Sequence, residues 1–178
     1  MRAIVLYSLL SLDGVAEEPG NWMFDADEEV FANLGRVIDT QDDVVLGRGT
    51  YDYWADYWPT SDVQPFAEFI NTTTKHVFTS GTTTTSWSES VSVDAPLAMY
   101  VEELKRSPGR DIGVHGSVSL AGNLLAADLV DRLELVVVPT IAGEGRRLFT
   151  SDAPLRRLTL ARVERSSTGC VFLTYRRP

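Results

Sequence analysis

The chain has 178 residues, 44% of them hydrophobic and 23% charged, a composition that excludes a disordered or fibrous protein. Nucleic-acid binding usually needs a basic face, and the net charge of -9 and the lack of such a face in the sequence argue against a nucleic-acid partner. Cys170 is the single cysteine, which excludes an intrachain disulfide, and we expect no metal site. No apolar run reaches membrane-spanning length and the N-terminus does not resemble a signal peptide, so we expect a cytoplasmic protein without a membrane partner.

The first predicted element is a strand over residues 4–9, whose uninterrupted apolar run is typical of a sheet covered on both faces. Ser11-Leu12-Asp13-Gly14 then leaves this strand, and a loop rich in Glu, Pro and Gly follows. A helix is predicted to start near Asp25, because Asp25 and Glu28 resemble a capping box. The apolar stripe of this helix is formed by Val30, Leu34, Val37 and Ile38.

The rest of the chain alternates predicted strands with predicted helices. Residues 44–46 form a second buried strand, which runs directly into Gly47-Arg48-Gly49-Thr50. An aromatic cluster follows, made of Tyr51, Tyr53, Trp54, Tyr57 and Trp58. The remaining predictions are a helix at 63–70, a strand at 75–79, a solvated loop at 82–85, a helix at 95–105, a strand at 112–115, a helix from 116 to about 126, a strand at 133–138 and a hairpin of strands at 158–164 and 171–175.

This order of elements predicts an α/β fold of three layers. A mainly parallel sheet is expected to carry helices on both faces, and the closing hairpin is expected to add antiparallel strands at one edge. The sequence contains no internal repeat and no linker. Residues 1–178 are therefore expected to form a single domain.

Several chemistries are disfavoured by motifs that the sequence lacks. The two histidines, His76 and His115, lie far apart, which argues against a zinc site. No Gly-x-Ser-x-Gly segment is present, which weakens a serine hydrolase interpretation. The chain also lacks a Walker A loop and a Gly-x-Gly-x-x-Gly segment after the first strand, which argues against a P-loop NTPase and a standard Rossmann dehydrogenase.

The junction after the second strand is a candidate phosphate site. Gly47 and Gly49 allow close approach of the backbone to a ligand, and the N–H groups at a helix start attract an anion. Arg48 and Thr50 add a charged donor and a hydroxyl donor. The alternative is a glycine turn with a surface arginine, because short glycine motifs are weak signals.

Two further strand ends carry candidate ligand residues. At His115-Gly116-Ser117, Gly116 could admit a pyrophosphate and Ser117 could cap the helix or donate to the ligand. A capped helix without a ligand is the alternative, and His115 is interpreted as packed or hydrogen-bonded to the backbone rather than catalytic. Ser80 follows the strand at 75–79, at the edge where open α/β sheets bind ligands. Three such junctions in one small domain favour a dinucleotide.

Trp22 and Asp27 form a separate candidate pair on the substrate side. A carboxylate beside an aromatic wall can accept hydrogen bonds from the N–H edge of a heterocycle and assist proton delivery. The structural alternative is that Asp27 stabilises the helix dipole and Trp22 packs at an edge of the core.

Several of these segments together resemble a known family. Val44-Val45-Leu46-Gly47-Arg48-Gly49-Thr50-Tyr51 resembles the dihydrofolate reductase segment in which a hydrophobic strand precedes Gly-Arg-x-Thr. Ser11-Leu12-Asp13-Gly14 resembles the opening motif of the reductase domain of bifunctional riboflavin-biosynthesis deaminase-reductases, the RibD C-terminal domain family. The same group is resembled by His115-Gly116-Ser117, Leu129-Val130-Asp131-Arg132-Leu133, Pro139, Gly143-Glu144-Gly145 and Leu148-Phe149. The resemblance extends from Ile4 to Tyr175, and without the zinc-binding deaminase domain this chain resembles a stand-alone relative.

The resemblance implies a dihydrofolate-reductase-like fold, NADPH as the hydride donor and a homodimer. It implies cofactor contacts at the phosphates for Gly47, Arg48 and Thr50, near the adenosine 2′-phosphate for Ser80, and at the pyrophosphate for Gly116 and Ser117, with His115 beside them. Asp13 and Gly14 would lie in the loop near the nicotinamide, with Asp13 toward the substrate. The spacing of Trp22 and Asp27 matches a tryptophan followed by a substrate-binding acid.

The leading hypothesis is an NADPH-dependent reductase that transfers hydride to a C=N or C=O group of a pterin-like or ribosylated pyrimidine-like molecule. In this hypothesis Asp27 is the catalytic candidate, as an anchor or proton donor for the substrate. The rival is a non-catalytic nucleotide-binding or sensing protein on the same fold. A purely structural dimer, whose glycine junctions are only turns, is a second rival.

Overall fold

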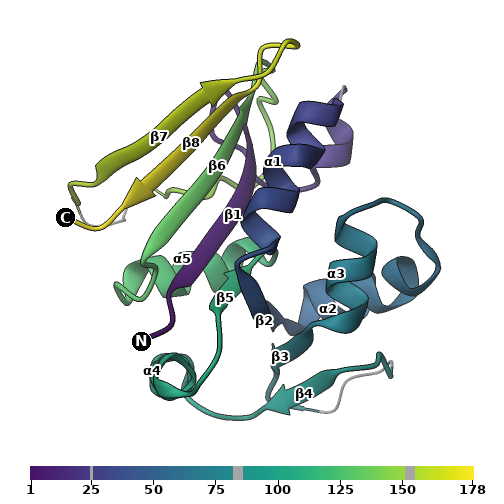
Figure 1. Cartoon of the computed structure of the whole chain (residues 1–178), viewed down its shortest axis with the longest axis vertical. Helices are drawn as coiled ribbons and strands as arrows, with labels where there is room; N and C mark the ends of the chain where they lie inside the picture. Colours follow the sequence, from purple (N-terminus) through teal and green to yellow (C-terminus); the bar gives the residue numbers. More distant parts are fainter. Residues whose placement is uncertain (25, 82–85, 151–154) are drawn as a thin grey trace.

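The computed structural model describes residues 1–24, 26–81, 86–150 and 155–178, and it shows one twisted sheet with helices on both faces (Figure 1). The strands are β1 (Ile4–Ser11), β2 (Gln41–Gly47), β3 (Thr74–Phe78), β4 (Ser90–Val93), β5 (Asp111–Val114), β6 (Arg132–Val138), β7 (Thr159–Arg165) and β8 (Val171–Arg176). The helices are α1 (Glu28–Ile38), α2 (Arg48–Tyr57), α3 (Phe66–Thr72), α4 (Leu97–Arg106) and α5 (Val118–Ala126), with 3-10 turns at η1 (Pro19–Asn21) and η2 (Trp58–Thr60).

The strand order within the described residues is β4-β3-β2-β5-β1-β6-β8-β7. Neighbouring strands from β4 to β6 are parallel, whereas β8 is antiparallel to both β6 and β7. The predicted α/β fold, a mainly parallel sheet with a C-terminal antiparallel hairpin, is therefore confirmed. The predicted hairpin strands correspond to β7 and β8 within one residue at each end.

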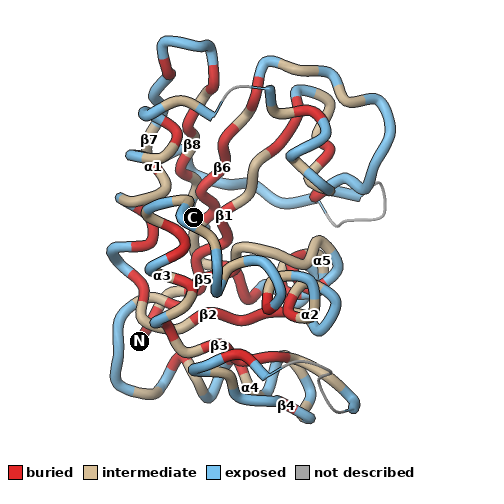
Figure 2. The backbone as a smooth tube through the Cα atoms, turned by 90° about the vertical axis from the view of Figure 1, so that its right-hand side faces the viewer, coloured by how far each residue is buried: buried red, intermediate tan, exposed pale blue. Residues whose placement is uncertain are grey.

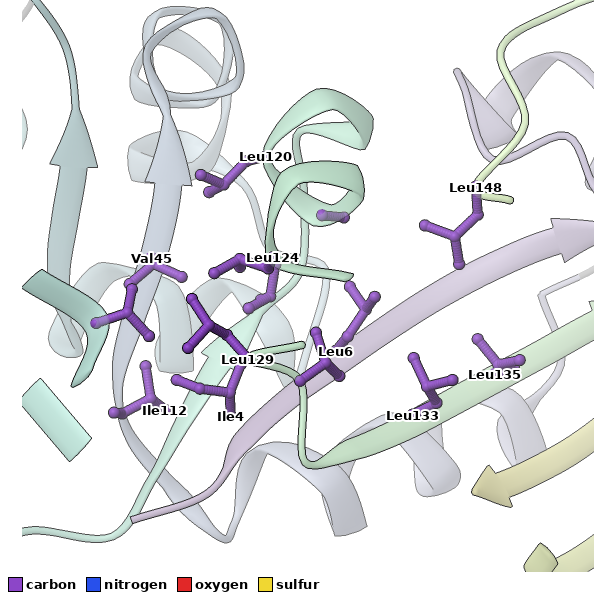
Figure 3. Packing of buried hydrophobic residues seen from close by; sticks show 14 of the residues in the cluster. Ile4, Leu6, Val45, Ile112, Leu120, Leu124, Leu129, Leu133, Leu135 and Leu148 are labelled. Atoms are coloured by element: carbon purple, nitrogen blue, oxygen red, sulfur yellow. The ribbon is translucent and has the colours of Figure 1, made fainter. Parts of the chain in front are cut away.

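Both faces of the central strands are buried, as their uninterrupted apolar runs predict (Figure 2). On one face, Val45 belongs to the core cluster that includes Leu120 and Leu124 of α5 (Figure 3). On the other face, its neighbours Val44 and Leu46 belong to a cluster with side chains of α1, α2 and α3. The sheet is thus the middle of the three predicted layers.

Two local predictions differ from the structure. β4 pairs with β3 at the edge of the sheet but was not predicted, because its four residues Ser-Val-Ser-Val are mostly not buried and give little apolar signal. α1 begins at Glu28 and is capped by Asp27, so the predicted cap is two residues too early. Asp25 itself lies outside the described residues. The predicted loop at 82–85 also lies outside them.

The end of the sheet formed by β7 is less covered than the centre. All residues of β7 except Arg162 are exposed, and they include the apolar side chains of Leu160 and Val163. Among the residues that the structure describes, no helix is both long enough and apolar enough to cross a membrane.

Candidate functional site

The predicted ligand residues come together at the carboxyl edge of the parallel strands. β3, β2 and β5 are neighbours in the sheet and parallel, so the segments that follow them leave at the same edge (Figure 1). Ser80 follows β3, Gly47 ends β2, and His115 to Ser117 follow β5. The three predicted junctions are therefore adjacent in space, which the order of the sequence does not reveal.

β1 and β5 separate before β1 ends, and a ligand crevice is expected at this point. These strands pair only at Ile4↔Ile112, Val5↔Gly113 and Leu6↔Val114, whereas β1 continues beside β6 as far as Ser11. The chain also reverses its direction of sheet building here, because β2 to β4 lie on one side of β1 and β6 lies on the other. Ligands of open α/β sheets bind at such a switch point, beyond the carboxyl ends of the strands.

The β2–α2 junction presents an uncapped helix start. Gly47 is the N-cap of α2 and has no side chain to cap the first turn, so the N–H groups there can receive a ligand. A Cβ atom at Gly49 would meet nothing within 4 Å, so this position is open. The exposed Arg48 side chain contacts Asp52 (Nε to Oδ2, 3.3 Å) and reaches toward Gly81.

The β5–α5 junction fits tightly against the first one. A Cβ atom at Gly47 would lie 2.5 Å from Ser117 Oγ, and a Cβ atom at Gly116 would lie 2.8 Å from Thr50 Cγ2. Only hydrogen fits at either glycine, so glycine is what allows the two turns to touch. Ser117 caps α5 by accepting from Leu120 N–H and has φ 67°, a left-handed conformation that is unusual for serine.

His115 lies at the junction, but its ring turns back into the molecule. The ring contacts Tyr7 of β1 and Phe66 and Phe69 of α3, with centroids 5.3 to 5.7 Å apart. Its Nε2 is 2.6 Å from Gln41 Oε1. Burial lowers the pKa of His115 to about 3, so the imidazole is neutral at physiological pH. The ring is therefore packed, as the sequence interpretation favoured, but its hydrogen bond goes to a side chain and not to the backbone.

Asp13 holds two loops together beyond the ends of β1 and β6. Its carboxylate accepts hydrogen bonds from Ser11 Oγ and from the N–H groups of Ala142 and Gly143, and it contacts Arg147. The Ser11 hydroxyl, followed by the Ala142 N–H, lowers the pKa of Asp13 to about 2. Gly14, at φ 85°, takes the left-handed conformation that this turn requires.

Trp22 and Asp27 have structural partners in the described residues. Trp22 is 5% exposed and donates from Nε1 to the carbonyl of Glu17 at 2.9 Å. Asp27 accepts from Val30 N–H at 2.8 Å through Oδ1 and from Thr168 Oγ1 at 2.6 Å through Oδ2. The Thr168 hydroxyl is the largest cause that holds the pKa of Asp27 below its ordinary value.

Sequence reasoning missed two residues whose side chains bond to the segments at this edge. Gln41 starts β2 and is 1% exposed beneath the His115 ring. Arg146 donates to Glu17 and, at 3.0 Å, to Ser119 Oγ in the first turn of α5. A polar residue opening a buried strand was a signal for Gln41, whereas nothing local connects Arg146 with α5.

A separate hollow of about 1020 Å³ lies on the α5 side of β6 and β8. Its wall combines apolar side chains with arginines, including Leu133, Tyr175 and Arg176. Its lining does not include Gly47, Gly116 or Ser117, so it is a different place from the glycine junctions.

Comparisons with known proteins agree with this geometry. The family model described as RibD C-terminal domain matches residues 2–172. Two Bacillus subtilis (strain 168) proteins, the uncharacterized proteins YyaP and YwjB, are each 28% identical to the chain. The YyaP match covers 98% of this chain and 94% of YyaP, and the YwjB match covers 87% and 88%.

Solved structures share the fold at low sequence identity. A candidate riboflavin biosynthesis protein from Shewanella sp. PV-4 has a TM-score of 0.80 at 19% identity, covering 99% of both chains. A pyrimidine reductase-like protein from Corynebacterium diphtheriae has a TM-score of 0.68 at 16% identity, covering 98% of this chain and 91% of that one. A Thermotoga maritima diaminohydroxyphosphoribosylaminopyrimidine deaminase / 5-amino-6-(5-phosphoribosylamino)uracil reductase has a TM-score of 0.72 at 14% identity, covering 99% of this chain but 57% of its own length.

Proposed function

The chain belongs to the RibD C-terminal domain family, and from this premise we propose that it is an NADPH-dependent reductase of a small heterocyclic substrate, pterin-like or ribosylated pyrimidine-like. The observation that carries the proposal is the meeting of two helix N-termini, those of α2 and α5, at neighbouring strand ends. Two such termini and their N–H groups form a site for a pyrophosphate.

The residues at this edge fit a dinucleotide. The uncapped start of α2 at Gly47, the open Gly49 and the Thr50 hydroxyl would hold phosphate on one side. Gly116 and Ser117 would hold it on the other. Arg48, which reaches toward Gly81 beside Ser80, would meet a 2′-phosphate. When bound, NADPH supplies the hydride, and the protein supplies orientation and exclusion of water.

Nucleotide titration tests this proposal. Wild-type protein is expected to bind NADPH more tightly than NADH, and Arg48→Ala should weaken NADPH binding by about tenfold while changing NADH binding little, because Arg48 would contact a charged phosphate. Arg106→Ala is the matched control, since Arg106 is also exposed and also forms an i,i+4 pair, with Glu102. Failure of the wild type to bind either nucleotide would remove the reductase proposal.

A non-catalytic nucleotide-binding or sensing protein is the second candidate, and a specific observation favours it. On the substrate side, both oxygens of Asp27 are engaged by Val30 and Thr168, and the Asp13 carboxylate is engaged by its loop. Measuring NADPH oxidation with a panel of pterins and pyrimidines distinguishes the reductase from the non-catalytic protein. Binding without oxidation across the panel would favour the sensing role.

We also propose that the protein forms a homodimer through the open end of its sheet. Leu160 pairs with Tyr175 and Val163 with Leu173, which puts these apolar side chains on one face beside the hollow. Phe149, Leu155 and Leu158 are exposed nearby in the sequence. Monomeric proteins rarely expose a large contiguous apolar patch, and a second copy offers the same patch in return.

A further inference from the structure

The ring of His115 occupies a space that a glycine keeps open. A Cβ atom at Gly113 would lie 2.8 Å from His115 Nε2 and 2.1 Å from Gln41 Oε1, so a side chain at this position would displace one or both of these groups. Gly113 is in the middle of β5 and pairs with Val5 and Val44 on its two sides. The hydrogen bond between His115 and Gln41 therefore crosses the sheet directly over Gly113.

Three aromatic side chains from two more elements pack against this ring. Phe66 and Phe69 of α3 contact it edge-on, at 5.3 and 5.6 Å. Tyr7 contacts it from β1, and Tyr7 is the first residue of β1 beyond the last pair with β5, Leu6↔Val114. His115 is likewise the first residue beyond that pair. The ring thus joins β1, β2 and α3 at the point where the two strands separate.

The bond to Gln41 fixes one orientation of the imidazole. Nε2 is bonded to Gln41, while Nδ1 is shielded and has no hydrogen-bond partner among the described residues. Buried polar atoms without hydrogen-bond partners are rare and destabilising. The packing around the ring must therefore offset the cost of burying Nδ1 without a partner. Neutrality of the imidazole, enforced by burial, removes the larger cost of a buried charge.

Two residues further along, the backbone is in a conformation that needs support. Ser117 has φ 67° and ψ 91°, and such strained residues persist only where neighbouring structure over-determines them. From outside, Gly47 approaches Ser117 closely. From inside, the nearest anchored side chain that precedes Ser117 is His115.

We propose that His115 is a positioning residue, which acts through Gln41 to hold the Gly116–Ser117 turn in the shape that receives the cofactor pyrophosphate. The inference rests on the proposed nucleotide-binding function. It assigns the role to a hydrogen bond beneath the turn, in the space left by Gly113, and not to contact between the imidazole and the nucleotide.

A double-mutant cycle tests this role, with NADPH and NADH as the probes. His115→Phe keeps the ring packing but removes the bond, and Gln41→Leu removes the other partner. Each single variant is expected to bind NADPH and NADH about tenfold more weakly than wild type, and the loss should be the same for both because both contain the pyrophosphate. This equal loss of affinity distinguishes His115 from Arg48, since Arg48→Ala should weaken NADPH binding much more than NADH binding.

The double variant separates positioning from stability. With both partners apolar, no buried polar group is left alone, so the melting temperature should recover toward the wild-type value. Affinity for both nucleotides should stay low. Recovery of affinity together with melting temperature would overturn the inference, since the bond would then act only through stability.

His76→Phe is the control, because His76 is also a buried histidine with two side-chain partners but lies under α4, where it bonds to Tyr100 and Asp43. It should lower the melting temperature and leave nucleotide affinity unchanged. If His115→Phe binds NADPH and NADH as tightly as wild type does, the positioning role of His115 is wrong but the proposed function stands. If wild type binds neither nucleotide, the proposed function falls with it.

Discussion

Asp27 caps α1, and one substitution can separate this capping role from the proposed substrate role. As the N-cap of α1 it accepts from Val30 N–H, and asparagine can do the same, whereas alanine cannot. Asp27→Ala should therefore lower the free energy of unfolding by about 1 kcal/mol, and Asp27→Asn by much less. Urea unfolding measures both.

Turnover then shows whether the carboxylate takes part in chemistry. If Asp27 anchors or protonates the substrate, Asp27→Asn should lower turnover while NADPH affinity and stability stay near the wild-type values. Equal turnover in Asp27→Asn and wild type would leave Asp27 with the capping role only.

Lys75 makes stability depend on pH at the alkaline end. It is fully buried, donates to the carbonyls of Ile70 and Thr73 and lies over Trp87. Burial lowers its pKa from 10.5 to about 8, so between these values the unfolded chain binds the proton more strongly than the folded chain. The free energy of unfolding of wild type, relative to Lys75→Met, should therefore rise as pH increases from 8 to 10. Urea unfolding at both pH values checks the sign, and a fall would contradict it.

At the scale of elements, hydrophobic pattern was enough to predict most of the sheet. The runs at 4–9, 44–46 and 133–138 are buried on both faces in the structure, and burial on both faces is what removes alternation from a strand. β4 escaped prediction because an exposed four-residue edge strand depends on pairing with β3, a tertiary contact. Local capping chemistry could not choose between Asp25 and Asp27, since both precede the same apolar stripe.

The candidate site was predictable as separate turns but not as an assembly. Glycine and hydroxyl residues at strand ends identified Gly47, Gly116 and Ser117 from local chemistry. The contact between Gly47 and Ser117 depends on β5 inserting beside β2, an order that the sequence alone does not determine. The bond of His115 to Gln41 spans 74 residues and follows from the same insertion.

At the scale of the whole molecule, charge is unevenly distributed along the chain. Half of the 16 lysines and arginines fall in residues 146–178, together with only two of the 25 acidic residues. This basic segment contains the β7–β8 hairpin and part of the hollow. Several of its arginines pair with carboxylates from the rest of the chain, such as Arg147 with Asp13 and Arg177 with Asp131, so ion pairs join the basic segment to the acidic part of the protein.

The proposed dimer gives a prediction at this scale. Substituting Leu160→Lys and Val163→Lys together should convert the protein to a monomer, because lysines on an edge strand oppose pairing and apolar contact. Their exposure (48% and 56%) means that the melting temperature of the monomer fold should change little. Sedimentation velocity measures the mass in solution. Val91→Lys is the control, since Val91 is 46% exposed on the opposite edge strand β4. Loss of the dimer in this variant would contradict an interface at β7.

The contact between Gly47 and Ser117 also constrains how relatives of this protein can diverge. Because Ser117 Oγ already occupies the place of a Cβ at position 47, an alanine at 47 becomes acceptable only when residue 117 gives up its side chain. Glycine at 117 would at the same time relieve the left-handed backbone there. Positions 47 and 117, 70 residues apart, are therefore expected to vary together among relatives, with a larger residue at 47 accompanied by a smaller one at 117.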